Sequence, residues 1–208
     1  MAFKRLTAFF LCASALLGAS AANSYSVAWD APELTTVTGF FTLPNLPKIE
    51  DGSLVGPGLH NSDGVLQVVY DARWSNLWIG PEFRGTPAVP WGPGFEVDQG
   101  EEMKFLFNHT DDGYWVVEVG WATGGGAHGG FGLEDNVLNS AVFTADLNEI
   151  PFDFGPINYR NVSLTATTPA SEWCDKFRQV GDYPLTVTGT EASGNTCTVA
   201  SITQDSPQ

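Results

Sequence analysis

The lack of helical periodicity limits most strongly what this chain can fold into. Beyond the first 21 residues, no run of ten or more residues carries apolar side chains at helical spacing. The 13 prolines and 23 glycines of the chain would also interrupt most helices. Short runs of β-branched and aromatic residues instead alternate with Gly, Pro, Asn and Asp. The pattern predicts an all-β fold, an antiparallel sandwich or barrel.

The expected strands and turns alternate along most of the chain. Strands are predicted at 35–43, 65–70, 77–79, 103–107, 114–121, 141–147, 157–166 and 197–202. Turns or loops are predicted at 44–47, 56–58, 87–94, 111–113, 124–132 and 193–195. The segment Asp111-Asp112-Gly113 lies between two strand-like runs and predicts a tight hairpin. No internal repeat and no linker interrupts this pattern.

The first 21 residues resemble a secretory signal peptide. Lys4 and Arg5 precede an apolar run at 6–17, which is too short to cross a bilayer, and Ala19-Ser20-Ala21 forms a cleavage signal. We therefore expect a signal peptide at 1–21 and a single secreted, extracellular domain at 22–208. No later segment has the roughly 20 apolar residues that a membrane span needs.

The two cysteines beyond this segment, Cys174 and Cys197, are expected to form one disulfide, because secretion passes through an oxidising compartment. Such a bridge would contribute about 3 kcal/mol to stability. Two glycosylation sequons begin at Asn108 and Asn161, and both asparagines are expected at exposed positions.

The charge balance excludes one class of partner. Cleavage would leave seven basic residues against 24 acidic ones, a net charge of about −17. Nucleic-acid binding needs clustered Lys and Arg, so no nucleic-acid partner is expected. Anionic membrane surfaces are disfavoured for the same reason. We expect a monomer.

Several enzyme motifs are absent or lack their context. Gly124–Gly129 matches G-x-G-x-x-G, but no helix follows it, so a flexible loop is the better interpretation. His60, His109 and His128 are far apart and do not form a zinc motif. No G-x-S-x-G nucleophile motif occurs. No metal and no cofactor are expected.

Gln67 is the polar exception in the apolar run Val65–Tyr70. In a strand it shares one face with Val65 and Val69. A buried amide without a partner costs about 1–3 kcal/mol, so Gln67 is either a hydrogen-bonded core residue or part of a site.

Carboxylates and tryptophans offer alternatives based on carbohydrate chemistry. Glu96 and Asp98 resemble the start of a glucanase E-x-D motif, but Glu101 follows at an odd separation that places it on the other strand face. Trp74, Trp78 and Trp91 lie in turn-rich sequence and are either core residues or exposed platforms for a sugar or peptide.

The order of several motifs resembles the fungal glutamic peptidases (eqolisins). The segments are TVTGFFTLP at 36–44, GVLQ at 64–67, YDA at 70–72, QGEEMKF at 99–105 and IPFDFG at 150–155. The resemblance implies a concanavalin-like antiparallel two-sheet β-sandwich. It also implies acid peptide hydrolysis by a glutamine and a glutamate, an oxyanion-stabilising amide and a general base.

The same resemblance implies that this chemistry is lost. Gln67 matches the family's glutamine, but in AVFTAD at 141–146 the glutamate position is occupied by Val142. LVGPG at 54–58 also replaces the family's W-V-G-x-D. Three acids are candidate substitutes: Glu118 and Glu82, which are candidates to face the same sheet, and Glu172, which precedes Trp173.

Three functions therefore remain in view. The first is a catalytically inactive secreted protein that binds an extended peptide or glycan around Gln67, with Trp74, Trp78, Trp91 and Glu118 as ligand-binding candidates. The second is an acid endopeptidase with a relocated carboxylate, which requires a Glu within about 4 Å of the Gln67 amide. The third is carbohydrate chemistry or lectin-like binding.

Overall fold

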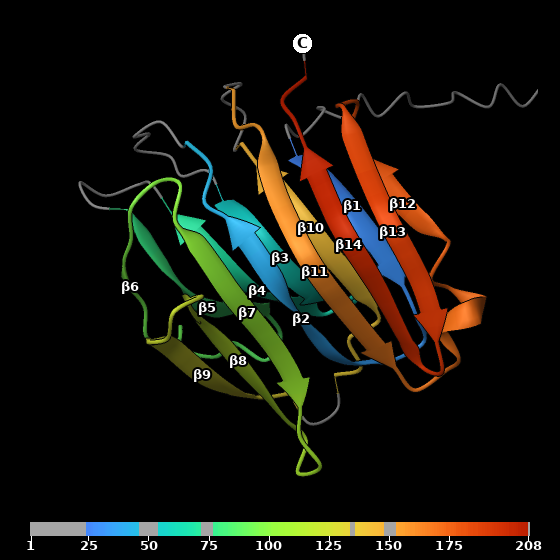
Figure 1. Ribbon diagram of the computed structural model, residues 1–208. Coiled ribbons are helices and arrows are strands. Elements are labelled where there is room, and N and C mark those ends of the chain that lie inside the picture. The colour runs from blue at the N-terminus through green and yellow to red at the C-terminus, as the bar shows by residue number, and fades with distance from the viewer. Residues whose placement is uncertain (1–23, 46–53, 72–76, 134–135, 148–152, 208) are drawn as a thin grey trace, which may run out of the picture.

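The protein is a sandwich of two antiparallel sheets, shown in a computed structural model (Figure 1). The structure describes residues 24–45, 54–71, 77–133, 136–147 and 153–207. These ranges contain 14 strands and one short 3-10 helix, η1 (Ala170–Glu172), and no α-helix. The expected signal peptide, Trp74 and residues 150–152 of the resemblance lie outside them.

Seven strands form the first sheet, which we call sheet A. In spatial order they are β12 (Phe177–Val180), β1 (Ser24–Asp30), β10 (Ser140–Asp146), β3 (Leu54–His60), β4 (Gly64–Asp71), β5 (Trp78–Gly85) and β6 (Phe95–Glu96). Gln67 lies on β4 and Val142 on β10, with β3 between them.

Seven strands also form the second sheet, sheet B. Their order is β13 (Leu185–Ser193), β14 (Thr196–Gln204), β11 (Ile157–Ala166), β2 (Leu34–Thr42), β7 (Glu102–His109), β8 (Tyr114–Trp121) and β9 (Gly126–Gly132). In Figure 1 sheet B lies in front of sheet A, and the strands of both run diagonally across the view.

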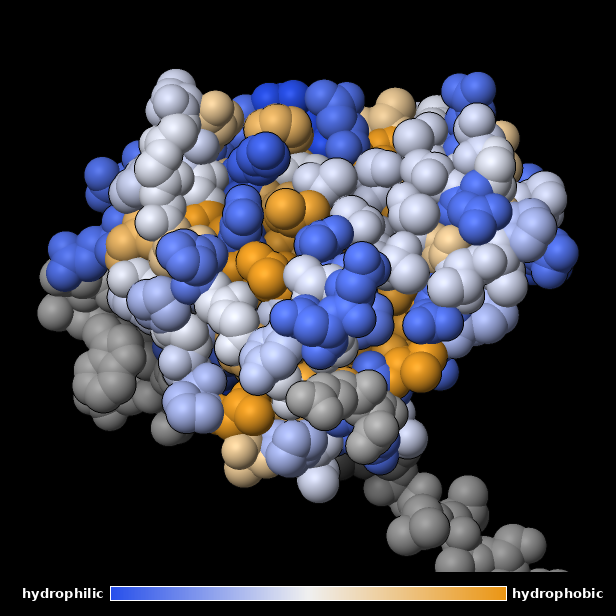
Figure 2. All heavy atoms as spheres, turned by 90° about the horizontal axis from the view of Figure 1, so that it is seen from below, coloured by the Kyte–Doolittle hydropathy of each residue, from blue (hydrophilic) through white to orange (hydrophobic). Residues whose placement is uncertain are grey.

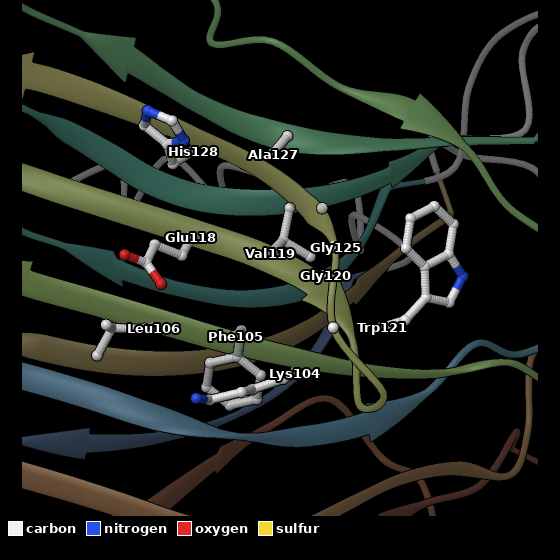
Figure 3. Close-up of a pocket in the computed structure, with 12 residues that line it drawn as sticks. Lys104, Phe105, Leu106, Glu118, Val119, Gly120, Trp121, Gly125, Ala127 and His128 are labelled. Carbon is white, nitrogen blue, oxygen red and sulfur yellow. The ribbon is translucent and has the colours of Figure 1, made fainter.

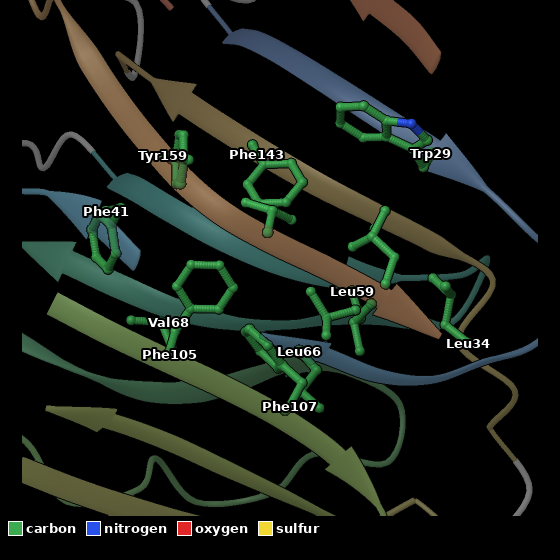
Figure 4. Close-up of a cluster of buried hydrophobic side chains, with 14 of the residues drawn as sticks. Trp29, Leu34, Phe41, Leu59, Leu66, Val68, Phe105, Phe107, Phe143 and Tyr159 are labelled. Atoms are coloured by element: carbon green, nitrogen blue, oxygen red, sulfur yellow. The ribbon is translucent and has the colours of Figure 1, made fainter. Parts of the chain in front are cut away.

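The core fills the space between the sheets because alternate side chains of each strand point inward. Leu66 and Val68 of β4 are fully buried there, and so is Phe143 of β10 (Figure 4). They meet aromatic rings of sheet B, for example Phe105, whose ring centroid lies 6.4 Å from that of Phe143. Burial of each such side chain stabilises the folded state by about 1.5–3 kcal/mol. The residues between these positions therefore face outward, and Gln67 is one of them.

Most predicted strands are confirmed, with their ends moved by a few residues. β8 and β11 have the predicted limits. Residues 111–113 form the expected hairpin turn, with Gly113 at a φ of 81° and the Thr110 amide donating to the Tyr114 carbonyl over 2.8 Å.

Two predicted turns are wrong. Residues 56–58 belong to β3, a central strand paired with β10 and β4, and residues 126–132 form β9 at the edge of sheet B. Glycine and proline in a strand weaken its pattern without preventing its pairing. The sequence pattern also did not predict the strands β1, β6, β12 and β13.

The disulfide is confirmed. The sulfurs of Cys174 and Cys197 are bonded, and their Cα atoms lie 5.3 Å apart. The bridge attaches the segment after η1 to β14, and the Cys174 carbonyl accepts a hydrogen bond from the Trp29 indole over 3.0 Å. The C-terminal segment is thereby tied to the core.

Of the two sequon asparagines, Asn161 is exposed, as expected, at a φ of 50°. Asn108 is half-buried, and its side chain accepts a hydrogen bond from the Thr36 hydroxyl over 3.2 Å, so it is less exposed than expected.

The surface is mixed in character. Seen from below, small hydrophobic areas are separated by hydrophilic residues (Figure 2). Among the residues with described positions, no helix is long and apolar enough to span a membrane.

Candidate functional site

Gln67 and Val142 lie in one row of side chains across the outer face of sheet A. The register pairs Gln67 with Glu82 on β5 and with Gly58 on β3, and it pairs Gly58 with Val142 on β10. Directly opposed residues of an antiparallel pair project to the same face. The two positions suggested by the sequence therefore share a face, with a glycine between them.

Glycines on β3 hollow this face. Gly56 and Gly58 occupy outward positions where the neighbouring strands carry side chains. A Cβ atom on Gly56 would lie 2.0 Å from the Val68 carbonyl oxygen, and its φ of 156° also disfavours other residues. A Cβ on Gly58 would lie 3.0 Å from the Gln67 Cβ. The sheet thus has a hollow along β3, between β4 and β10.

We call this hollow the trough. Its volume is about 250 Å³. It is lined by Val55, Gly56, Val65, Gln67, Val68, Val69, Arg84, Val142, Thr144 and Asp146. Its walls are mainly apolar, with the Gln67 amide on one side, a composition typical of ligand sites.

The Gln67 amide has a partner within the protein. Its Nε2 donates a hydrogen bond to Oε1 of Glu82. Nη2 of Arg84 lies 3.3 Å from the same oxygen. The Glu82 side chain has no solvent exposure, whereas that of Arg84 is 59% exposed. The structure therefore places a glutamate next to Gln67, but a buried one whose contacting oxygen already accepts two donors.

Val142 closes the opposite wall. It is half-buried on β10, between Gly58 on one side and Ala28 of β1 on the other. A valine side chain neither donates nor accepts a proton. At this position the trough has an apolar surface where the resemblance places a general base.

A polar cluster lies at the β12 side of the same face. The Asp30 carboxylate accepts a hydrogen bond from the Ser140 hydroxyl over 2.5 Å and pairs with Arg178, whose Nη2 is 3.3 Å away. Burial raises the pKa of Asp30, but Ser140, Arg178 and the charge of His60 outweigh it, so that the pKa lies below its ordinary value. Because the hydroxyl is directed to Asp30, the cluster does not form a Ser–His dyad.

Two of the three tryptophan candidates, Trp78 and Trp91, lie together in the described structure. Trp78 and Trp91 form a tilted pair with ring centroids 5.9 Å apart, and Trp91 is 44% exposed. Trp78 lies in register with Asp71, and its ring packs over Gly80, the residue opposite Val69 of the trough wall. The pair therefore adjoins the trough. Trp74 lies outside the described residues.

Glu118 does not face Gln67, so that expectation is wrong. It lies on the outer side of β8 in sheet B, opposite Leu106 and His128. There, together with Lys104, it lines a separate cavity of about 340 Å³ (Figure 3). β4 and β8 belong to different sheets, so the outer faces that carry Gln67 and Glu118 lie on opposite sides of the sandwich. The pattern of strands along the sequence does not show which sheet each strand joins.

Two other acids that the sequence brought into view, Glu101 and Glu172, do not line the trough. Glu101 turns back to accept hydrogen bonds from the Asp98 amide over 2.9 Å and from the Trp121 indole over 3.1 Å. Glu172 is exposed on η1. In the described part of the chain, no group of three or more His, Cys, Asp or Glu residues is arranged to hold a metal ion.

Comparisons with known proteins agree with this architecture. No family profile and no curated protein sequence matches the chain. Solved structures do: scytalido-glutamic peptidase in complex with a peptide-based transition-state analogue matches with a TM-score of 0.60 at 14% identity, covering 86% of this chain and 98% of that one. SCP-B, an eqolisin in complex with the tripeptide Ala-Ile-His, matches with a TM-score of 0.57 at 13% identity over the same shares. The chain has the β-sandwich fold of the glutamic peptidases.

Proposed function

We propose that this chain is a secreted protein that binds an extended peptide in the trough of sheet A and does not hydrolyse it. The observation that carries the proposal is the row Gln67–Gly58–Val142, in which the amide of a glutamic-peptidase-like site is kept while the opposite wall is apolar. The confirmed disulfide fits an oxidising, extracellular setting.

The shape of the trough supports an extended ligand. It runs along β3, and its walls are alternate residues of two flanking strands: Val65, Gln67 and Val69 on β4, and Val142, Thr144 and Asp146 on β10. A strand-like peptide places alternate side chains on one side at the same spacing. Apolar residues of the peptide would pack against Val65, Val69 and Val142.

The similar structures support a peptide as the ligand. Scytalido-glutamic peptidase is described with a peptide-based transition-state analogue and SCP-B with a tripeptide. At 13–14% identity this likeness concerns the fold, so the ligand class of this chain remains our proposal.

The burial and the hydrogen-bond partners of Glu82 favour binding over catalysis. A general base must reach a water molecule within about 3 Å. Glu82 has no exposed side-chain surface, and its Oε1 is occupied by Gln67 and Arg84. We infer that Glu82 holds the glutamine amide in place.

The contact between Glu82 and Gln67 is also the specific observation in favour of the alternative, an acid endopeptidase with a relocated glutamate. The two functions differ in one measurement. If the protein cleaves denatured casein at pH 3–4, and Glu82→Gln abolishes the cleavage, the alternative is correct and our proposal is wrong.

Binding is tested with Ala-Ile-His and with an array of unstructured pentapeptides at pH 4 and pH 6. Val142→Phe fills the trough and should weaken binding at least tenfold. Leu106→Phe places the same ring at a half-buried outward position of sheet B and should not. If the protein binds no peptide but binds glycans on a glycan array, the result would instead support the lectin-like alternative.

A further inference from the structure

We propose that the trough binds its peptide in one direction, with a carboxylate at Arg84 and a cationic group at Asp146. This inference rests on the proposed peptide binding and adds the orientation and the chemistry of the ligand's two ends. It is carried by the placement of charge along the trough rather than by its shape.

Two of the ten described residues that line the trough are charged, and they lie at opposite ends. Arg84 is in register with Val65, and Val65 with His60 at the end of β3. Asp146 is in register with Leu54, and Leu54 with Asp71, at the other end. Val65 and Asp71 are six residues apart on β4, a backbone distance on the order of 20 Å. An extended pentapeptide spans about 17 Å, so its ends can reach both charges.

Arg84 is suited to a carboxylate. Its side chain is 59% exposed, and its ion pair with Glu82 is made by one nitrogen, Nη2. A guanidinium has five N–H donors, so others remain to bind a second carboxylate as a fork. In a chain with nine basic and 24 acidic residues, a cation in the wall of the trough is a distinctive feature.

The two ends fix the direction of the ligand. A peptide with its carboxyl end at Arg84 and its amino end at Asp146 runs from the Leu54 end of β3 to the His60 end. It therefore lies over β3 in the same direction as that strand, and antiparallel to β4 and β10. The reverse orientation would place a carboxylate against Asp146, a repulsive contact.

The direct test uses two blocked pentapeptides of identical composition, acetyl-Lys-Ala-Phe-Ala-Glu-amide and acetyl-Glu-Ala-Phe-Ala-Lys-amide, titrated by calorimetry at pH 6. We expect the first to bind at least tenfold more tightly, because only it can satisfy both ends without reversing its backbone. Equal affinities would overturn the inference while leaving the proposed function intact. If neither these peptides nor the array binds, the proposed function fails as well.

The Arg84→Gln variant identifies the residue responsible. In this variant the preference should fall to the part that Asp146 supplies, and Arg84→Gln/Asp146→Asn should bind the two peptides within about twofold of each other. Arg160→Gln is the matched control, since Arg160 also pairs with a glutamate, Glu102, but lies in sheet B, and it should keep the wild-type preference. A preference that is undiminished in Arg84→Gln would overturn the assignment. Melting temperatures of both variants show whether each is folded.

The source of the carboxylate is distinguished by a second pair of peptides, Ala-Ala-Phe-Ala-Ala with a free or an amidated carboxyl end. If amidation weakens binding tenfold, a chain terminus is recognised, whereas a smaller effect, with the blocked Glu-ended peptide still preferred, assigns the site to an acidic side chain. Loss of preference in both pairs contradicts the inference.

Discussion

The side-chain amide of Gln67 donates a hydrogen bond to the carboxylate of Glu82, its directly opposed neighbour on β5. Glu82 is fully buried, so water does not solvate its carboxylate. The Gln67 amide supplies a hydrogen bond in place of water and offsets part of the cost of burying the charge. The sequence left two interpretations of Gln67 open, a hydrogen-bonded core residue or part of a site. The structure combines them, because the amide is held by the protein and also lines the trough.

The first prediction follows from this contact. Gln67→Leu should lower the free energy of unfolding by about 1–3 kcal/mol, because buried Glu82 loses a donor. Urea denaturation at pH 7 measures the effect. The double variant Gln67→Leu/Glu82→Leu should be less destabilised than Gln67→Leu alone, since it removes the buried charge together with its partner. A single Gln67→Leu variant that is more stable than wild type would show that the contact has no stabilising role.

The strand pattern was predictable from the sequence wherever alternation was strong. β8 and β11, strands of eight and ten residues, contain β-branched and aromatic side chains along their length, and their limits matched the prediction. β3 was missed because its sequence, LVGPGLH, has the composition of a turn. Its place between β10 and β4 depends on partners distant in sequence, so local propensity is overridden by tertiary pairing.

The second prediction concerns Asp30 and pH. Its pKa is lowered in the folded protein, so its stabilising effect is present above the unfolded pKa of about 3.9 and is lost as pH falls through the lower, folded value. Asp30→Asn should therefore reduce the melting temperature at pH 7, and the difference from wild type should vanish near pH 2. Asp63→Asn, an exposed loop variant, is a control expected to show a smaller change at pH 7. A difference that persists unchanged at pH 2 would contradict the assignment.

The third prediction concerns the disulfide. Replacing Cys174 or Cys197 with Ser should destabilise the protein by about 2–5 kcal/mol, because the bridge closes a loop of 23 residues in sequence separation. Chemical denaturation with and without a reducing agent checks this: reduction should destabilise wild type and leave a double-serine variant unchanged. Two free thiols in the natively folded protein, found by mass spectrometry, would refute the bridge.

The site was only partly predictable. Gln67 and Val142 were identified by resemblance, and the strand register places them in one row. Glu82 was named as a possible substitute acid, but its burial and its partner depend on side-chain packing that the sequence does not reveal. Gly56 and Arg84 were missed, because a glycine that hollows a sheet and an arginine at the end of a trough acquire meaning only when the neighbouring strands are known.

The fourth prediction is that a carboxylate introduced into the row Gln67–Gly58–Val142 restores hydrolysis. Val142 and Gln67 are two strands apart, about 10 Å between backbones, and Gly58 between them has no side chain. Val142→Glu would therefore place a carboxylate across the trough from the amide, with room for a water molecule between them. We expect weak hydrolysis of denatured casein near pH 3–4, where a glutamate of ordinary pKa is partly ionised and can act as a general base.

Matched variants separate this chemistry from a contaminant or a folding effect. Val142→Gln has the same shape but no ionisable group, and Val142→Glu/Gln67→Leu lacks the amide, so both should be inactive. Adding Glu82→Gln to Val142→Glu should change the activity less than Gln67→Leu does if Glu82 only positions the amide. Activity that persists in Val142→Glu/Gln67→Leu would show that hydrolysis by the introduced carboxylate does not use the Gln67 amide on the other side of Gly58.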